Sequence, residues 1–231
     1  MTEGTVKGRR RYDNSGRAEQ ARATRQRILQ ATLTVLLDRG YGATTMGRVA
    51  AEAGVSVETV YKGFTSKPEL VRALLGTVLL GDDEPVALAD RPEFQAVGEE
   101  QSGLAVLSRY AALVRRLYDR LGPLPAILLV GARAGAAELR AFADDVNAKR
   151  LIDSARTAEQ VAARGPLRAG ADLDRARDLI WTLNSPEVHH LLTVDRGWTA
   201  DDYQQWLSTA LADALLPTRP ALDPSAQERA G

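Results

Sequence analysis

The sequence predicts an all-α protein in which an N-terminal three-helix helix-turn-helix domain precedes a larger helical bundle. In several segments of the 231-residue chain, apolar residues recur at intervals of three and four, which places them on one face of a helix. Capping residues and glycines stand where those helices would begin and end. No segment alternates apolar and polar residues with the period of two that is typical of a half-buried strand.

The first predicted helix begins at Ala18 and ends at Gly40. Residues 1–17 are polar and contain three glycines, so we expect them to form a disordered basic arm. The buried face of the helix is formed by residues at positions i, i+3, i+4 and i+7, namely Ile28, Ala31, Thr32 and Val35.

Three short helices are expected next, each with its own capping residue. Thr45 can cap a helix that stops at Gly54, and Ser56 can cap a helix that continues to Phe64. Ser66 can cap the third, with the acidic residue of a capping box three positions later.

The rest of the chain is predicted to be a bundle of longer helices. Residues 81–102, acidic and with two prolines, are expected to form an irregular linker. The spacing predicts helices over 103–121, 124–135, 137–163, 173–184 and 200–216, and a short helix over 185–194. The tail 217–231 has three prolines in its first eight residues, and we expect it to be disordered.

Charge is divided unevenly along a chain whose formal net charge is zero. Residues 1–75 hold 13 Lys and Arg against 7 Asp and Glu, whereas residues 76–231 hold 17 against 23. A basic N-terminal part attracts phosphate and an acidic remainder does not. The absence of cysteine excludes disulfides, thiolate catalysis and cysteine zinc sites. No apolar run is long enough for a secretory signal or a membrane span, so we expect a cytoplasmic protein without a membrane partner.

The most informative segment is residues 44–64, which carries a helix-turn-helix pattern. Small Ala50 permits close helix approach, and Gly54 supplies the positive φ of a tight turn. Val60 and Phe64 are expected to anchor the second helix to the core. The remaining side chains of that helix would then project outward: Val57, Glu58, Thr59, Tyr61 and Lys62.

Three short runs in this region resemble the N-terminal domain of the TetR/AcrR family of transcription regulators. They are Ala-Gly-Val-Ser at 53–56, Thr-Val-Tyr-Lys-Gly-Phe at 59–64 and Ser-Lys-Pro-Glu-Leu at 66–70. Their order and spacing match the family pattern, and the resemblance covers about residues 18–75. It implies a DNA-binding domain over 18–75 and a ligand-binding and dimerisation domain over 76–216.

The resemblance also implies roles for individual residues in DNA binding. Thr45 and Arg48 would meet phosphate, and Thr59 and Tyr61 would contact phosphate and base edges. Lys67 would bind phosphate at the next helix N-terminus, where unpaired N–H groups favour an anion. Val57, Glu58 and Lys62 complete the expected DNA-binding set.

Two positions depart from the family pattern. Gly47 stands where many members carry a longer polar side chain, and Glu58 where many carry a small residue or proline. A carboxylate repels phosphate but can accept a hydrogen bond from cytosine N4. Base recognition is therefore expected to differ from that of better-known members.

In the bundle, a mixed polar and apolar pocket for a small-molecule effector is expected at Tyr110, Arg133 and Trp181. The resemblance implies a homodimer joined by the last two long helices as a four-helix bundle. The apolar patterns in those helices place Leu179, Leu183, Leu207 and Leu211 at the interface.

Other classes of function fit less well. The chain shows no catalytic triad order, phosphate loop or paired carboxylates, so we expect no enzyme and no cofactor. Adjacent His189 and His190 point about 100° apart on a helix and do not form a metal site. The expected function is a ligand-responsive repressor that binds a pseudo-palindromic operator on double-stranded DNA. An activator of the same fold, or an interaction module without DNA binding, is the alternative.

Overall fold

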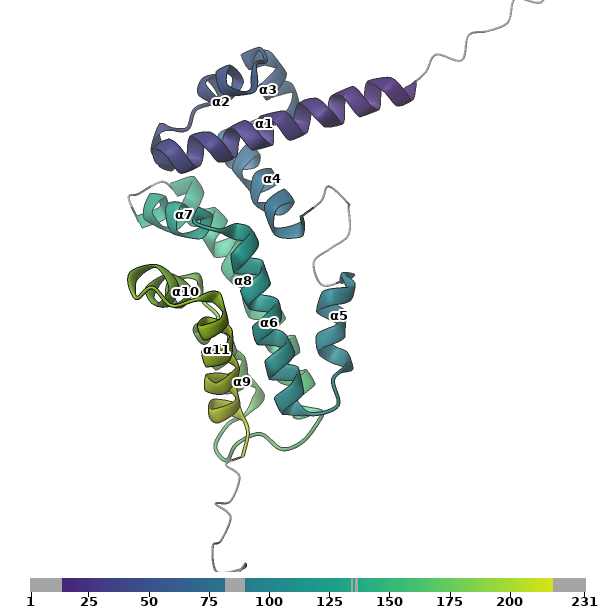
Figure 1. Cartoon of the computed structure of the whole chain (residues 1–231), viewed down its shortest axis with the longest axis vertical. Helices are drawn as coiled ribbons and strands as arrows, with labels where there is room; N and C mark the ends of the chain where they lie inside the picture. The colour runs from purple at the N-terminus through teal and green to yellow at the C-terminus, as the bar shows by residue number, and fades with distance from the viewer. Residues whose placement is uncertain (1–13, 82–89, 134, 136, 218–231) are drawn as a thin grey trace, which may run out of the picture. The chain divides into compact units, whose positions relative to one another are not determined.

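The structure is a computed structural model that describes residues 14–81, 90–133, 135 and 137–217, and every regular element in these ranges is helical (Figure 1). The chain forms two compact units, Met1–Leu74 and Leu75–Gly231. The boundary between them falls inside one helix, α4 (Lys67–Leu80).

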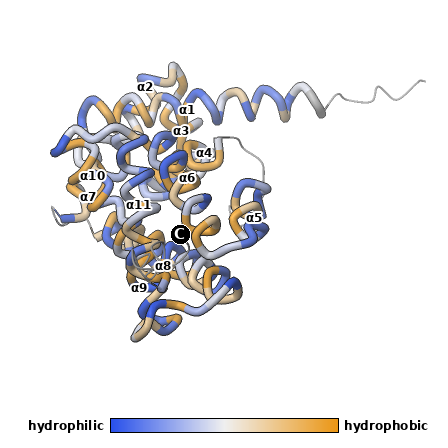
Figure 2. Tube along the Cα trace, turned by 60° about the horizontal axis from the view of Figure 1, so that its bottom comes forward, coloured by the Kyte–Doolittle hydropathy of each residue, from blue (hydrophilic) through white to orange (hydrophobic). Residues whose placement is uncertain are grey.

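The first unit opens with a long helix, α1 (Asn14–Ala43). Apolar and polar stretches alternate along it (Figure 2). The predicted face is buried, and the hydroxyl of buried Thr32 donates to the Ile28 carbonyl at 2.7 Å. Gly40, with φ of 70° and ψ of 176°, breaks the helical geometry where the sequence predicted an end. The helix begins four residues earlier than predicted, so residues 14–17 are helical; residues 1–13 of the predicted arm lie outside the described residues.

Two short helices, α2 (Met46–Ala53) and α3 (Val57–Gly63), follow with the predicted boundaries and caps. At the start of α4 the capping differs in detail from the prediction. Ser66 Oγ accepts from the N–H of Glu69 at 3.3 Å, as expected. The Glu69 carboxylate, however, accepts from the N–H of Thr65 at 2.7 Å and from its hydroxyl, so the reciprocal bond closes one residue earlier.

Part of the segment that the sequence predicted to be an irregular linker, residues 81–102, is helical. Residues Pro92–Glu99 form a helix, α5, with proline in its first turn, where a missing N–H costs nothing. The added methyl of an alanine at Gly98 would come within 2.7 Å of Gln160 Nε2, so α5 approaches α8 closely at this glycine.

The remaining helices lie close to their predicted ranges. They are α6 (Gly103–Leu121), α7 (Leu124–Arg133), α8 (Ala137–Ala162), α9 (Leu173–Leu183), α10 (Pro186–His190), the π-helix η2 (Leu191–Asp195) and α11 (Ala200–Leu215). Thr199 and Asp202 form a capping box at the start of α11, with bonds of 3.1 and 3.2 Å.

The core of the second unit lies between α6, α8, α9 and α11. Its fully buried members include Val106, Leu107, Ala111, Ala176, Ile180, Tyr203, Leu207, Leu211 and Leu215. In the described part of the chain, no helix has the length and apolarity needed to cross a membrane. The same residues contain no cluster of three or more His, Cys, Asp or Glu that could hold a metal ion.

Candidate nucleic-acid interface

The tight turn between α2 and α3 depends on Gly54. Its φ of 64° and ψ of 40° lie in the left-handed region that a side chain disfavours. Its N–H donates to the Ala51 carbonyl at 3.3 Å, and the N–H of Val55 donates to the Ala50 carbonyl at 3.0 Å. These bonds end α2 and direct the chain into α3. At the other end of α2, Thr45 Oγ1 accepts from the N–H of Arg48 at 3.2 Å.

The helix α3 buries one face and exposes the other, as the sequence predicted. Val60 and Phe64 are 0% and 1% exposed, whereas Val57 is 38% and Tyr61 51% exposed. Glu58 and Lys62 are also exposed. A short helix anchored on one side and solvent-facing on the other has the geometry needed to enter a DNA major groove.

Thr59 is half-buried and lies at the edge of this face. Its N–H donates to Ser56 Oγ at 3.2 Å, and the two hydroxyl oxygens lie 3.0 Å apart. The Thr59 hydroxyl therefore takes part in capping α3.

The carboxylate of Glu58 is stabilised in its charged form. A hydrogen bond from its own backbone N–H lowers the pKa of Glu58, and the Ser56 hydroxyl lowers it further. The N-terminal end of α3 also favours a negative charge. The exposed face of α3 thus carries a carboxylate, an aromatic ring and an ammonium group.

Cationic side chains from neighbouring elements lie close to α3 and α2. The Arg25 guanidinium, on α1, lies 4.5 Å from the centroid of the Phe64 ring. Arg48 is exposed and donates to the Ala43 carbonyl at 2.5 Å. Arg25 was not among the predicted DNA-binding residues, although it belongs to a series of basic residues along the first helix that could have indicated it: Arg17, Arg22, Arg25 and Arg27.

Lys67 does not lie on the α3 face with the other predicted residues. Its side chain is half-buried, its Nζ donates to the Tyr41 carbonyl at 3.0 Å, and it lies 3.9 Å from the centroid of the Tyr41 ring. Lys67 therefore joins the start of α4 to the end of α1.

A family model described as "Bacterial regulatory proteins, tetR family" matches residues 28–74. Residues 28–74 of the chain are therefore similar to the DNA-binding domain of the TetR family. The matched segment contains the whole of α2 and α3 and the Gly54 turn. It covers all of the predicted DNA-binding residues.

Among the relatives of this chain, the HTH-type transcriptional regulator YvkB of Bacillus subtilis is 44% identical over 54 residues, or 23% of this chain and 29% of YvkB. TtgW of Pseudomonas putida is 36% identical over 90 residues, or 39% of this chain and 62% of TtgW. The chain therefore matches less than two thirds of the length of these relatives.

Solved structures resemble nearly the whole chain in fold. NalD, a secondary repressor of the MexAB-OprM multidrug efflux pump in Pseudomonas aeruginosa, has a TM-score of 0.64 and 23% identity, covering 86% of this chain and 98% of NalD. SmeT in complex with triclosan has a TM-score of 0.64 and 20% identity, covering 87% of this chain and 97% of SmeT. At these identities the likeness establishes the shared fold.

Two of the three predicted effector residues, Tyr110 and Trp181, meet around Arg150. Tyr110 is buried, and its hydroxyl accepts from the Asn184 side-chain amide, which in turn accepts from Arg150. Trp181 is half-buried, its carbonyl accepts from Arg150 at 2.6 Å, and its ring lies 5.4 Å from that guanidinium. Arg133 is exposed on α7 and forms no hydrogen bond or ion pair to this group, so the structure does not bring it together with the other two, and its effector role stays a prediction.

Two of the four predicted interface leucines, Leu207 and Leu211, need correction, whereas the interface role of Leu179 and Leu183 stays a prediction. Leu207 and Leu211 are 0% exposed within a single chain, because the apolar face of α11 packs on α6 and α9. They are core residues and cannot meet a second subunit. Leu179 and Leu183 are half-buried and pack against the same core. Large apolar side chains are instead exposed just before α11, namely Leu191 at 55%, Val194 at 63% and Trp198 at 37%.

Proposed function

We propose that this protein is a transcriptional repressor of the TetR family that binds a pseudo-palindromic operator as a homodimer and leaves it when a small molecule binds the second unit. The observation that carries DNA binding is the division of α3 into a buried face and an exposed face of Val57, Glu58, Tyr61 and Lys62. Thr45 and Arg48 lie exposed at the start of α2, where they can contact phosphate.

Glu58 is proposed to read a base rather than the backbone. Its charged carboxylate accepts hydrogen bonds and cannot donate to phosphate. In the major groove the group that it can recognise is the N4 amine of cytosine. This role is compatible with its exposed position in the first turn of α3.

A homodimer is proposed because one α3 reads a single half-site, and two copies related by a two-fold axis double the contacts. With Leu207 and Leu211 in the core, we propose that the exposed apolar residues Leu191, Val194 and Trp198 contribute to the interface. Association would remove their apolar surface from water, which is favourable.

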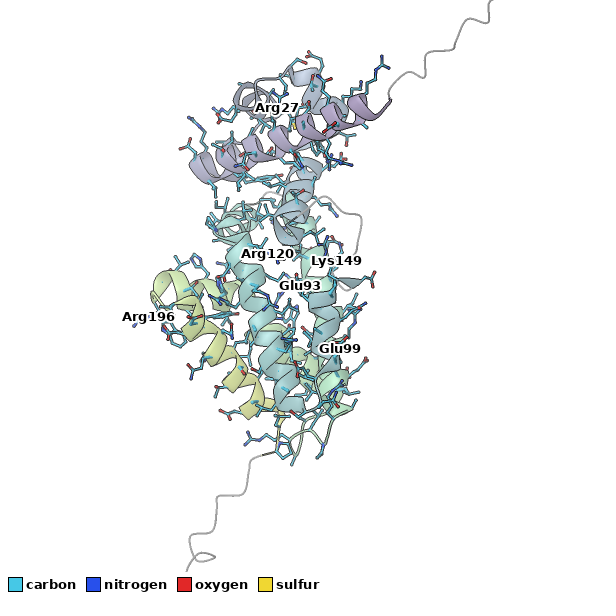
Figure 3. All side chains as sticks on the ribbon, turned by 45° about the vertical axis from the view of Figure 1, so that its right-hand side comes forward. Arg27, Glu93, Glu99, Arg120, Lys149 and Arg196 are labelled. Atoms are coloured by element: carbon cyan, nitrogen blue, oxygen red, sulfur yellow. The ribbon has the colours of Figure 1, made fainter. Side chains whose placement is uncertain are left out.

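A route by which an effector could act on the first unit runs through Arg120 at the end of α6. Arg120 donates to the Leu79 carbonyl in the last turn of α4 at 3.3 Å. The same guanidinium makes two bonds, of 3.1 and 3.4 Å, to the Glu93 carboxylate on α5 (Figure 3). Movement of α6 would thus reach α4, which continues into the helix-turn-helix unit. We propose that the protein acts in the cytoplasm.

The experiment that tests this function is fluorescence anisotropy with labelled DNA from upstream of the gene, titrated with purified full-length protein over a salt series. The expected result is specific binding with a dimer stoichiometry. The logarithm of the binding constant should fall linearly with the logarithm of salt concentration. An affinity equal to that for unrelated DNA of the same length would contradict a sequence-specific regulator.

A further inference from the structure

The second unit contains a half-buried cation without a counter-ion. The Arg150 guanidinium on α8 donates to Asn147 Oδ1 at 2.9 Å, to the Trp181 carbonyl at 2.6 Å and to the Asn184 side-chain oxygen. All three acceptors are neutral. No carboxylate among the residues that the structure describes forms an ion pair with Arg150. The carboxylates of Asp145 and Asp153 pair with other side chains, Lys149 and Arg156.

The Asn184 side chain occupies the position that an anion would take. Its oxygen accepts from Arg150, while its Nδ2 donates to the Tyr110 hydroxyl. A carboxylate has the same planar shape and two acceptor oxygens, and a guanidinium binds it more strongly than an amide. In its place a carboxylate could accept from Arg150 and also from the hydroxyl of Tyr110.

A further hydroxyl group in this core has no hydrogen-bond partner, namely that of Tyr203 on α11, and Tyr203 is 0% exposed. Ser154 lies four residues after Arg150 and therefore on the same face of α8. It is also 0% exposed, and its hydroxyl lies close enough to the Tyr110 hydroxyl to lower the pKa of Tyr110. Buried polar atoms normally have partners, so the Tyr203 hydroxyl is a polar group available to a ligand.

The same region is lined with aromatic rings. Tyr118 donates through its hydroxyl to the Asn184 carbonyl at 2.6 Å and stacks on His189 with ring centroids 4.1 Å apart. Tyr203 meets the His189 ring edge-on at 4.8 Å. Burial raises the pKa of Tyr110 to about 12 and lowers the pKa of His189 to about 4, so these groups are neutral at physiological pH.

Other acidic groups near the cluster do not neutralise Arg150. Asp153 on α8 and Glu187 on α10 are close enough to raise the pKa values of Tyr110 and Tyr118 respectively. Neither forms an ion pair with Arg150. Arg150 therefore has no ion-pair partner among the described residues, although two carboxylates lie near the cluster.

We infer that this cluster binds a small aromatic carboxylate, whose carboxylate displaces the Asn184 side chain from Arg150 and whose ring lies among Tyr110, Tyr118 and Trp181. The inference rests on the proposed effector-binding role of the second unit and names the chemical class of the effector. Asn184 is the C-cap of α9, directly before α10, so its displacement would change the junction of these two helices.

The test is calorimetric titration of the full-length protein with benzoate, benzamide and acetate. Benzoate is expected to bind at least tenfold more tightly than benzamide, which lacks the charge, and than acetate, which lacks the ring. Equal affinity for benzoate and benzamide would overturn the inference, as would no binding of benzoate.

Variants of Asn184 and Arg150 test whether benzoate binds at this cluster. Asn184→Asp supplies a carboxylate to Arg150 from within the chain, so it should weaken benzoate binding at least tenfold while the protein remains folded. Arg150→Gln should have the same effect, and Arg196→Gln, at an exposed arginine (Figure 3), should have none. Because Arg150→Gln could impair folding, the isosteric Asn184→Asp variant is the decisive test of where benzoate binds. An unchanged benzoate affinity in Asn184→Asp would refute the site.

The calorimetry is separate from DNA binding. A wild-type protein that binds its operator but not benzoate refutes the effector class and leaves the regulator function intact. A protein that binds benzoate at Arg150 but no operator supports the site and refutes the proposed function instead.

Discussion

The ammonium group of Lys67 lies against both the backbone and the ring of Tyr41, 3.0 Å from the carbonyl oxygen and 3.9 Å from the ring centroid. Tyr41 follows Gly40, at which α1 loses its helical geometry, and Lys67 is the first residue of α4. The pair therefore fixes how two helices of the DNA-binding unit meet. A residue that the family resemblance assigned to phosphate contact has a structural role here.

This contact predicts that Lys67→Met destabilises the first unit. The variant keeps the aliphatic stem but removes the charge from the Tyr41 ring and a donor from its carbonyl. The cost should be about 1–2 kcal/mol, and the melting temperature should fall by several degrees. Circular dichroism melting measures it. Lys62→Met, at an exposed position of α3, is the control and should melt like the wild type.

Exposed and buried residues of α3 should respond differently to truncation. Tyr61→Ala should weaken operator binding with no change in melting temperature, because the ring is 51% exposed. Lys62→Ala should also lower the salt slope by about 0.9 if it neutralises one phosphate. Phe64→Ala, in the core, should instead destabilise the fold by about 3–5 kcal/mol. If Tyr61→Ala lowered the melting temperature as much as Phe64→Ala, the division of α3 would be wrong.

Glu58 should control sequence preference more than affinity. In Glu58→Gln the side chain keeps its shape but loses its charge and gains donor N–H groups, which suit adenine. Selection from a randomised operator library should show a change at one position in each half-site. A uniform change in affinity for all sequences would mean that Glu58 does not contact a base.

Because Leu207 is buried and Val194 is exposed, we expect a charged substitution to have different effects on folding and assembly at the two positions. Leu207→Asp places an unpaired charge in the core and should unfold the second unit, at a cost of several kcal/mol. Val194→Asp, at a 63% exposed position, should leave the helicity intact and yield a monomer. Sedimentation and circular dichroism together distinguish these outcomes. A folded Val194→Asp dimer would remove this residue from the proposed interface.

The protein should lose stability as the pH falls below about 6.5. Burial lowers the pKa of His189 to about 4, while Asp119 opposes this shift and His190 adds to it. In the unfolded chain the pKa is about 6.5, so between these values the unfolded state binds the additional proton. Because His189 is only partly buried, its contribution between pH 7.5 and 5 is at most about 2 kcal/mol.

His189→Phe tests this pH dependence, because it keeps a ring against Tyr118 but does not titrate. Urea unfolding of both proteins at pH 7.5 and 5 should give a smaller loss in the variant. The same loss in both proteins would show that other groups carry the pH dependence.

The sequence alone determined most of the helices, many of their caps and the helix-turn-helix, but not the helix α5. These depend on local chemistry: Thr45, Ser56 and Thr199 cap helices through bonds to residues three positions later, and Gly54 adopts a conformation that needs no distant contact. The outward direction of Tyr61 also follows from helical periodicity once Val60 and Phe64 are assigned to the core.

Only the tertiary structure decided what covers each apolar face and which distant polar groups meet. The spacing of Leu207 and Leu211 identifies a buried face of α11 but does not distinguish a partner subunit from α6 of the same chain. Asn184 lies 34 residues from Arg150 and 74 residues from Tyr110 in the sequence, and their contacts depend on how α6, α8 and α9 pack. The spacing of apolar residues specifies which side of a helix is buried. The packing among helices determines which neighbouring helix covers that side.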